Sequence, residues 1–336
     1  MSARGHNVAI VAPREARIYE AALKRGLNAG ALPIAGKNPT GLLAMRRWLR
    51  VHPVDVVNTH SSTDSWLAAL ACATLARAPA IVRTRHISAP IPTNSPTRWL
   101  YCNATRHVVT TGENLRMQLV RDNGFAAEHI TSIPTGIDAA RFVPGARDAA
   151  RRLTGLPPDR RLIGIVATLR SWKGHRYLIE ALSLLPEDVG LVIVGDGPQR
   201  LNIESKIREL GMSNRTWLAG NRDDVLPWLQ SLDVFALPSY ANEGVPQALV
   251  QAMLCGLPCV TTAAGSIGEI ARDGETAIAV EAEDAADLKR GLERVLGDAR
   301  LRERLGTAAR QHCAANFGVE TMLDRMEKVF RDVAHA

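Results

Sequence analysis

Two successive series of short apolar segments alternate with amphipathic segments along the 336 residues, and this alternation limits the possible folds. Such a pattern is typical of parallel sheets whose strands are joined by helices. The first series has strands in HNVAIVAP, VDVVNTH, AIVRTRH, HVVTTG and ITSIPTG, with helices near 14–26, 39–51, 62–77 and 113–122. The second has strands in LIGIVATL, LVIVGDG, TWLAGN, VFALPS and PCVTTAA, with helices near 174–184, 198–210, 224–230, 245–255 and 285–296. We predict an α/β chain with two doubly wound units.

The boundary between the two series is predicted at about residues 140–160. The segment GIDAARFVPGARDAARRLTGLPPDRR is rich in Gly, Pro and Arg and has no clear period. We therefore expect one domain over 1–145 and a second over 146–318. A last helix near 319–334 follows a polar gap, so we expect the segment 319–336 to pack elsewhere, with a return to the first domain as one option.

The beginning of the chain departs from this pattern. A doubly wound sheet normally opens with a strand, a glycine-rich turn and a helix. Here ARGHNVAIVAP reads as the end of that first helix followed by the second strand. We expect the first sheet to lack its opening strand.

Composition and charge exclude several classes of protein. No run approaches the roughly 18 apolar residues of a spanning helix, and MSARGHNVAIVAP lacks the pattern of a signal peptide, so we expect a cytoplasmic protein. The five cysteines are scattered without zinc spacing and are expected to be small buried residues. Residues 1–145 hold 17 Lys and Arg against 8 Asp and Glu, and residues 146–336 hold 24 against 26. The basic first half favours an anionic membrane surface or an acidic acceptor, and no nucleic-acid motif accompanies it.

The segment 41–52, GLLAMRRWLRVH, has two interpretations. Leu42, Met45 and Leu49 share one helical face, and three arginines crowd the rest. This is the pattern of a helix at a membrane interface, where three cations would give only transient attachment. It is also the pattern of an ordinary helix packed on a sheet.

The segment 237–274 contains the clearest binding chemistry. The strand VFALPS ends in a loop with Glu243 and Gly244, and a helix opens near Val245 to Gln247 with Pro246 in its first turn. Free amides and the positive end of the helix dipole favour an anion such as a diphosphate. Glu243 can then point at hydroxyls of an attached sugar. Gln251, two turns down the helix, can reach a second pair of hydroxyls such as those of a ribose.

This segment resembles the donor-binding signature of the family 4 retaining glycosyltransferases. That signature is Glu, seven residues and Glu, followed by A-M-x-x-G-x-P-V-V and a G-x-x-E-x-x-x-x-G tail. Supporting segments, in the same order, are RGHNVAIVAP, IPTGIDAARFVP, ATLRSWKGHRYLIEAL, GDGPQR and AGNRDDVLPWLQSLDVFALPS. The resemblance covers nearly the whole chain and implies the GT-B fold, with two Rossmann-like domains facing a cleft. It makes 1–145 the acceptor side and 146–318 the nucleotide-sugar side.

The resemblance implies roles for residues that match the family pattern. Lys173 corresponds to the lysine on the donor diphosphate, where a cation neutralises the charge of the leaving group. Glu243 corresponds to the carboxylate that holds sugar hydroxyls, and Gly244, Val245 and Pro246 would offer backbone groups. Other positions have both a donor-contact and a purely structural interpretation: Gly195 and Asp196 in a strand-end turn, Ser239 and Tyr240 after a strand, and Glu269 in the tail.

Two departures from the family pattern stand out. The second glutamate is Gln251 here, which keeps hydrogen-bonding capacity without the charge, so we expect weaker donor binding. The usual G-R-L-x-x-x-K is A-T-L-R-S-W-K here, with Thr168 in the place of the arginine. Arg170 is then a candidate for the second cation, or a surface arginine.

On the acceptor side, His86 ends the strand AIVRTRH and resembles the histidine that the family places beside the reacting sugar. His60, at the end of VDVVNTH, is a weaker candidate of the same kind. The chain has no Asp-x-Asp to hold a divalent ion, so we expect a metal-independent enzyme without a cofactor. The resembled family retains the anomeric configuration of the donor.

We therefore predict a retaining glycosyltransferase that uses a nucleotide-sugar donor. The expected acceptor is a glycan or glycolipid of the bacterial cell envelope, with the protein in the cytoplasm or peripheral on the inner membrane. A nucleotide-sugar epimerase and a non-catalytic nucleotide-sugar-binding protein are the alternatives. Relatives open with a strand, a Gly-Gly turn and a helix ending in A-x-x-G-H, and only ARGH is present here. We accordingly expect an N-terminally shortened form with weak or no activity.

Overall fold

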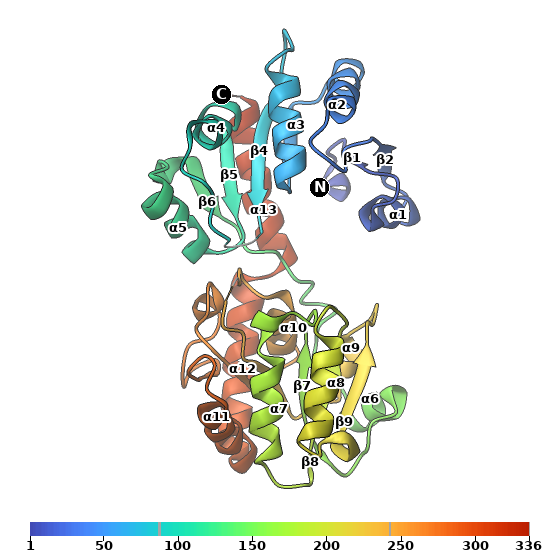
Figure 1. Ribbon diagram of the computed structural model, residues 1–336, viewed down its shortest axis with the longest axis vertical. Helices are drawn as coiled ribbons and strands as arrows, with labels where there is room; N and C mark the ends of the chain where they lie inside the picture. Colours follow the sequence, from blue (N-terminus) through green and yellow to red (C-terminus); the bar gives the residue numbers. More distant parts are fainter. Residues whose placement is uncertain (87–88, 242, 336) are drawn as a thin grey trace. The chain divides into compact units, whose positions relative to one another are not determined.

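The computed structural model describes residues 1–86, 89–241 and 243–335. It confirms the α/β class with parallel sheets in two compact units (Figure 1). Unit 1 comprises Met1–Ile133 together with Leu323–Ala336, and unit 2 comprises Pro134–Met322.

Unit 1 alternates strands and helices as its apolar pattern predicts. Its strands are β1 (Ala9–Ala12), β2 (Asn28–Ala31), β3 (Val56–Thr59), β4 (Ala80–Arg85), β5 (His107–Thr110) and β6 (Ile130–Ser132). Its helices are α1 (Arg17–Lys24), α2 (Pro39–Val51), α3 (Ser62–Cys72), α4 (Ser95–Trp99) and α5 (Glu113–Asn123), with short turns η1 (Ser2–Arg4), η2 (Leu100–Ala104) and η3 (Ala127–His129). The strand β2 was not predicted, because its sequence NAGA lacks the β-branched and aromatic residues that mark strands.

The strands of unit 1 form two separate pieces of sheet. Within the described residues, β1 pairs only with β2, and β3, β4, β5 and β6 form a parallel sheet in that order. One edge of β1 and one edge of β3 thus have no ladder partner in this part of the chain.

The helix α2 is an ordinary amphipathic helix of the core. Asn38 caps it by accepting a hydrogen bond from the amide of Gly41 at 2.7 Å, and Pro39 occupies its first turn. Met45 and Leu49 are 3% and 6% exposed and belong to the core of unit 1. The apolar face proposed for a membrane interface is therefore already covered by protein, apart from the partly buried Leu42.

Unit 2 is built on a longer sheet. In the described residues its parallel strands follow the order β12-β11-β10-β7-β8-β9. These are β7 (Arg161–Val166), β8 (Val189–Val194), β9 (Thr216–Gly220), β10 (Val234–Leu237), β11 (Cys259–Thr261) and β12 (Ile278–Ala279). The helices are α6 (Arg147–Thr154), α7 (His175–Ser183), α8 (Arg200–Glu209), α9 (Leu226–Gln230), α10 (Gln247–Leu254), α11 (Ala285–Gly297) and α12 (Ala299–Asn316), with turns η4 (Ser171–Lys173), η5 (Ser213–Arg215) and η6 (Ile267–Glu269).

The last helix, α13 (Val319–Ala334), begins in unit 2 and continues in unit 1. In unit 1 its Glu327 accepts hydrogen bonds from Arg4 at 3.1 Å and pairs with His6 at 3.0 Å. The hydrogen bond with His6 contributes most to lowering the pKa of Glu327 below its ordinary value, and the hydrogen bond with Arg4 contributes next. Arg325 donates to the carbonyl of Ser132 at 2.8 Å, and Val329 and Val333 are buried.

The cysteines are mostly buried, as predicted, and their burial raises the thiol pKa. The pKa of Cys72 rises to about 11, and those of Cys255 and Cys313 to about 12. Cys259 is also buried, whereas Cys102 is exposed and departs from the prediction.

Across the described ranges, no helix is both long enough and apolar enough to pass through a membrane.

The two sheets should differ in local stability, because their strands differ in burial. All residues of β8 are buried, whereas β1 and β2 contain one buried residue, Ala12, in eight. We predict that amide hydrogen exchange in β8 is at least about 100-fold slower than in β1 and β2. Exchange followed by mass spectrometry measures this difference. Equal protection would show that the exposed piece of sheet opens only when the whole chain unfolds.

Candidate functional site

A partly buried ion pair lies in unit 2 next to the amino end of α10. The Lys173 ammonium donates to Glu243 Oε1 at 2.6 Å, and the two side chains are 18% and 5% exposed. Lys173 ends the turn η4, and Glu243 lies in the loop between β10 and α10. The residues are 70 positions apart in the sequence, so the fold has to bring their two loops together.

Gly174 allows the loop of Lys173 to approach the loop of Glu243. Its φ of +74° is a left-handed conformation, and a β-carbon there would lie 1.9 Å from the carbonyl oxygen of Pro238. The contact is extended by the amide of Tyr240, which donates to the carbonyl of Trp172 at 2.9 Å. Any side chain at position 174 would push the two loops apart.

A second glycine holds Glu243 from the other side. Gly265 has a φ of +57°, and a β-carbon there would lie 2.1 Å from the carbonyl oxygen of Glu243. The amide of Ser266 donates to that carbonyl at 3.2 Å. Glu269 ends the turn η6 that follows, and its amide donates to the carbonyl of Ser266 at 3.2 Å. The tail of the donor signature therefore supports the backbone of Glu243.

The amino end of α10 follows directly after this loop. The helix starts at Gln247, so Pro246 is its N-cap and lies one residue before the first turn in which it was predicted. Its carbonyl accepts from the amides of Leu249 and Val250 at 3.1 and 3.2 Å. Among the described residues the amides of Gln247 and Ala248 have no acceptor, and such free amides attract an anion.

The other predicted residues of this segment lie around the helix end. Val245 is buried and Gly244 is partly buried, directly before the N-cap. Gln251 is partly buried on α10, and its side-chain amide has no hydrogen-bond partner in the described part of the chain. The Ser239 hydroxyl is fully buried and has no partner among the described residues. These polar groups are available to a ligand that reaches them.

Gly195 and Asp196 form a tight turn at the end of β8. Gly195 has a φ of +137°, and a β-carbon there would lie 2.0 Å from the carbonyl oxygen of Ala167. The Asp196 carboxylate accepts from the amide of Gly197 at 2.7 Å and lies 3.6 Å from Arg200. These contacts account for both residues structurally, and a nucleobase contact stays a prediction.

Arg170 and His175 lie on either side of Lys173 in the sequence. Arg170 is exposed, with its guanidinium 5.6 Å from the centre of the Trp172 ring. His175 is 2% exposed, and burial, together with the charge of Lys173, lowers its pKa to about 4. A neutral imidazole thus stays beside Lys173 at neutral pH. Sequence reasoning missed His175, although it follows Lys-Gly at the start of a predicted helix.

His86 and His60 lie together in unit 1. His86 follows β4 and His60 follows β3, and these neighbouring strands are parallel. His60 Nδ1 and His86 Nε2 are 3.0 Å apart, and the two rings lie edge to edge, with planes 16° apart and centres 5.3 Å apart. The two histidines that the sequence analysis ranked separately are therefore a hydrogen-bonded pair.

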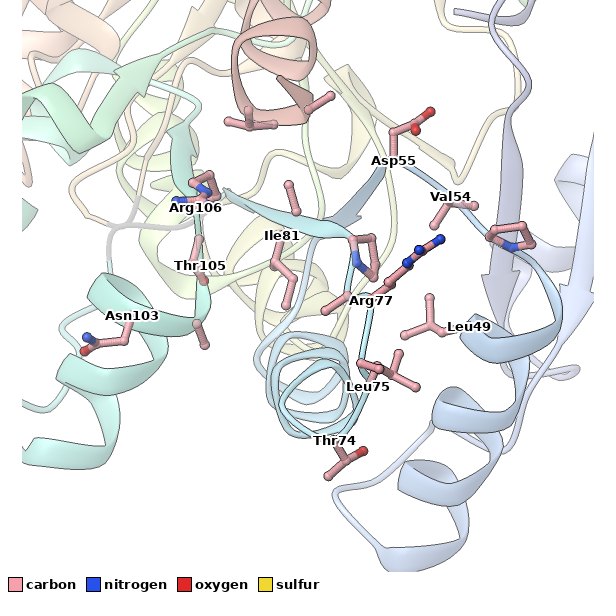
Figure 2. A pocket seen from close by; sticks show the side chains of 18 of the residues that line it. Leu49, Val54, Asp55, Thr74, Leu75, Arg77, Ile81, Asn103, Thr105 and Arg106 are labelled. Carbon is pink, nitrogen blue, oxygen red and sulfur yellow. The ribbon is translucent and has the colours of Figure 1, made fainter. Parts of the chain in front are cut away.

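A large hollow in unit 1 lies at the opposite end of the same strands. It has a volume of about 1330 Å³ and reaches the amino ends of β4 and β5, at Ala80, Ile81 and Arg106 (Figure 2). Arg77 and Arg106 line it together with Asp55. Because helices end on this side, cationic side chains here offset the negative ends of the helix dipoles. The histidine pair lies at the carboxyl ends of the strands, so this hollow is not part of the candidate site.

Within the ranges that the structure describes, no three His, Cys, Asp or Glu side chains are placed to hold a metal ion. The expected metal independence stays a prediction.

Comparison with known proteins gives two family matches. Residues 1–141 match the family described as Glycosyltransferase Family 4, and residues 146–312 match the family described as Glycosyl transferases group 1. Together the two matches cover both series of strands and helices.

Similar proteins support these matches. The chain is 30% identical to D-inositol 3-phosphate glycosyltransferase of Corynebacterium diphtheriae, over 69% of this chain and 57% of that protein. It is 31% identical to the lipopolysaccharide core biosynthesis glycosyltransferase LpsE of Rhizobium meliloti, over 68% and 65%. It thus spans less than two thirds of the length of either relative. An Escherichia coli UDP-Gal:alpha-D-GlcNAc-diphosphoundecaprenol alpha-1,3-galactosyltransferase is 26% identical, over 88% of this chain and 80% of that protein.

A solved structure has the same fold. The Anabaena protein HepE, crystallised with UDP-glucose, superposes with a TM-score of 0.84, over 96% of this chain and 91% of that one, at 20% identity. This likeness confirms the predicted GT-B fold. With the two family matches, it confirms the resemblance first drawn from residues 237–274: the chain belongs to the family 4, group 1 glycosyltransferases.

Proposed function

We propose that this chain is a retaining, metal-independent glycosyltransferase that moves a sugar from a nucleotide-sugar donor to a glycan or glycolipid acceptor. The observation that carries the proposal is the partly buried Lys173–Glu243 pair beside the amino end of α10. It combines a cation, a carboxylate and free amides in one place, and these are the groups that a sugar diphosphate requires.

Lys173 is the proposed partner of the donor diphosphate. An ammonium has three hydrogens to donate, and one is used by Glu243 Oε1. The remaining hydrogens can bind phosphate oxygens and offset the charge that develops as the nucleoside diphosphate leaves. The amides of Gln247 and Ala248 would add to this neutralisation without a metal ion.

Glu243 is the proposed ligand of the sugar hydroxyls. Among the described residues, Glu243 Oε1 accepts from Lys173 and Oε2 has no partner, so Oε2 can accept hydrogen bonds from a sugar. Its loop lies against Gly174 at the carbonyl of Pro238 and against Gly265 at the carbonyl of Glu243 itself. Such a fixed carboxylate does not need to reorganise when the donor binds.

The other predicted donor contacts complete this proposal. We assign the ribose to Gln251, backbone contacts to Gly244, Val245 and Pro246, and supporting contacts to Ser239 and Glu269. Arg170 is a candidate second cation, and Gly195 and Asp196 are candidates near the base. The UDP-glucose bound by HepE supports a uridine donor as the first choice to test.

Two relatives support a glycan or glycolipid acceptor. LpsE acts in lipopolysaccharide core biosynthesis, and the Escherichia coli relative acts on a sugar linked to diphosphoundecaprenol. A lipid-linked glycan would place the reaction at the cytoplasmic face of a membrane. The excess of basic residues in 1–145 fits an anionic surface of this kind.

Incubation with labelled UDP-, GDP- and ADP-sugars tests the proposal. We expect acceptor-dependent transfer from one of them, with the anomeric configuration of the donor retained and with full activity in EDTA. Epimerisation of the donor without an acceptor, or binding without turnover, would replace the proposal by one of the two alternatives.

We predict that Lys173→Ala and Glu243→Ala each lower transfer by more than about tenfold, because each removes a charged hydrogen-bonding partner of the donor. Glu243→Gln separates the effect of charge from that of shape. Lys289→Ala is the matched control, because Lys289 pairs with Glu293 on α11 at 2.7 Å away from the loops of Lys173 and Glu243. Steady-state rates and melting curves measure the effects. Full activity of both site variants with native melting would refute the assignment.

We predict that Gln251→Glu keeps or tightens the binding of the nucleoside diphosphate, by up to about fivefold, because a carboxylate accepts more strongly from ribose hydroxyls. Titration calorimetry with UDP measures the change. Gln311→Glu adds the same charge at an exposed position of α12 and is the control. A marked loss of affinity in Gln251→Glu alone would mean that Gln251 contacts a group other than the ribose.

A further inference from the structure

The pair formed by His60 and His86 has a geometry that restricts both rings. His60 Nδ1 and His86 Nε2 are 3.0 Å apart, within hydrogen-bond distance. The ring planes differ by only 16°, with centres 5.3 Å apart. The two nitrogens therefore lie on the line between the ring centres, so the rings are nearly coplanar and the hydrogen bond lies in the plane of both.

The fold fixes His60 more firmly than its exposed position suggests. Its amide donates to the carboxylate of Asp64 at 3.1 Å, and the amide of Ser61 donates to the same carboxylate at 2.8 Å. The Ser61 hydroxyl in turn accepts from the amide of Asp64 at 3.2 Å, which completes a capping box at the start of α3. The backbone of His60 is thus part of a helix cap.

His86 is also held at its backbone. Its carbonyl accepts from the Thr111 hydroxyl at 3.4 Å, and β4 pairs with strands on both sides. Adjacent parallel strands end at the same edge of a sheet, and the residues after β3 and β4 meet there. The backbone of both histidines is therefore set by regular structure, while the mutual bond sets their rings.

A hydrogen bond between two imidazoles needs one proton between the nitrogens. Either His60 Nδ1 donates to His86 Nε2, or His86 Nε2 donates to His60 Nδ1. Each arrangement fixes which nitrogen of a neutral His86 ring carries its proton. Desolvation lowers the pKa of both rings, His60 further lowers that of His86, and Asp64 opposes the shift in both. Protonation of both rings would break the bond, because each nitrogen in it would then be a donor.

We propose that His60 is a positioning residue that sets the ring orientation and the proton position of His86. The kinetic consequence rests on the proposed function, in which His86 lies beside the reacting sugar. The geometry of the two side chains does not rest on the proposed function, because both lie within unit 1. In this proposal His60 acts on His86, whereas the sequence analysis considered His60 as a second candidate for the histidine beside the reacting sugar.

Two substitutions separate the loss of the hydrogen bond from the loss of the ring. His60→Phe keeps a flat ring and removes the bond. His60→Asn removes the ring and keeps a polar group near the place of Nδ1. His52→Phe is the matched control, because His52 lies beside the Trp48 ring, with centres 4.7 Å apart, and its Nδ1 is 3.0 Å from the Trp48 carbonyl oxygen.

The first measurement is the ¹⁵N spectrum of the imidazoles in the full chain, with His86→Gln used to assign the His86 signals. These shifts report which ring nitrogen carries the proton. We expect the His86 shifts to change in His60→Phe, to return toward those of the native protein in His60→Asn, and to stay unchanged in His52→Phe. Unchanged His86 shifts in His60→Phe would overturn the proposal, whatever the activity.

The second measurement is the pH profile of transfer with the donor and acceptor found in the screen. We expect kcat to fall about three- to tenfold in His60→Phe with little change in donor KM, and the profile to shift because His86 titrates without its neighbour. His60→Asn should recover most of the rate. If His60→Phe retains the native rate and profile, His60 does not position His86 for the reaction. If the native chain transfers no sugar while the spectra change as expected, the proposed function fails and the pair remains.

Discussion

The close approach of two loops in unit 2 is the constraint on which the candidate donor site depends. Lys173 reaches Glu243 only because Gly174 lets its loop lie against the carbonyl of Pro238. Gly265 makes the equivalent approach to the carbonyl of Glu243 from the other side. An ion pair with little exposure is costly to desolvate, and such a pair persists when the surrounding backbone fixes both partners. Here the two glycines provide that backbone.

Most of the fold could be predicted from the sequence, because apolar runs such as those of β7 and β8 are continuous and are separated by clear helical periods. The helix α6 was hidden because its buried face contains a charged residue. Arg151 is 3% exposed and donates to the carbonyls of Ser231 and Pro158 and to the carboxylate of Asp233. A search for a period of apolar residues treats a buried arginine as a surface residue, so the period of α6 is not recognised.

The candidate site was partly predictable for a related reason. Lys173 and Glu243 were named from their segments, but a sequence cannot show that they bind each other 70 positions apart. The pairing of His60 with His86 was hidden in the same way, since it depends on which strands are neighbours. His175 was missed because a histidine at the start of a helix does not reveal its own burial. The sequence was sufficient to name candidate residues within one segment, but it was not sufficient to predict which residues of distant loops contact each other.

The path of the chain through the two units has a consequence for its synthesis. Unit 2 is one continuous segment, Pro134–Met322, whereas unit 1 needs both Met1–Ile133 and Leu323–Ala336. The helix α13 supplies the buried residues Val329 and Val333. It also supplies Asp324 and Glu327, which pair with Arg4, and Glu327 pairs with His6 as well. On a ribosome, domains generally fold in the order in which they emerge. Unit 1 emerges before unit 2, yet it can acquire α13 only after unit 2 has been translated, so the nascent chain has to carry an incomplete unit 1 with uncovered apolar surface while Pro134–Met322 is made.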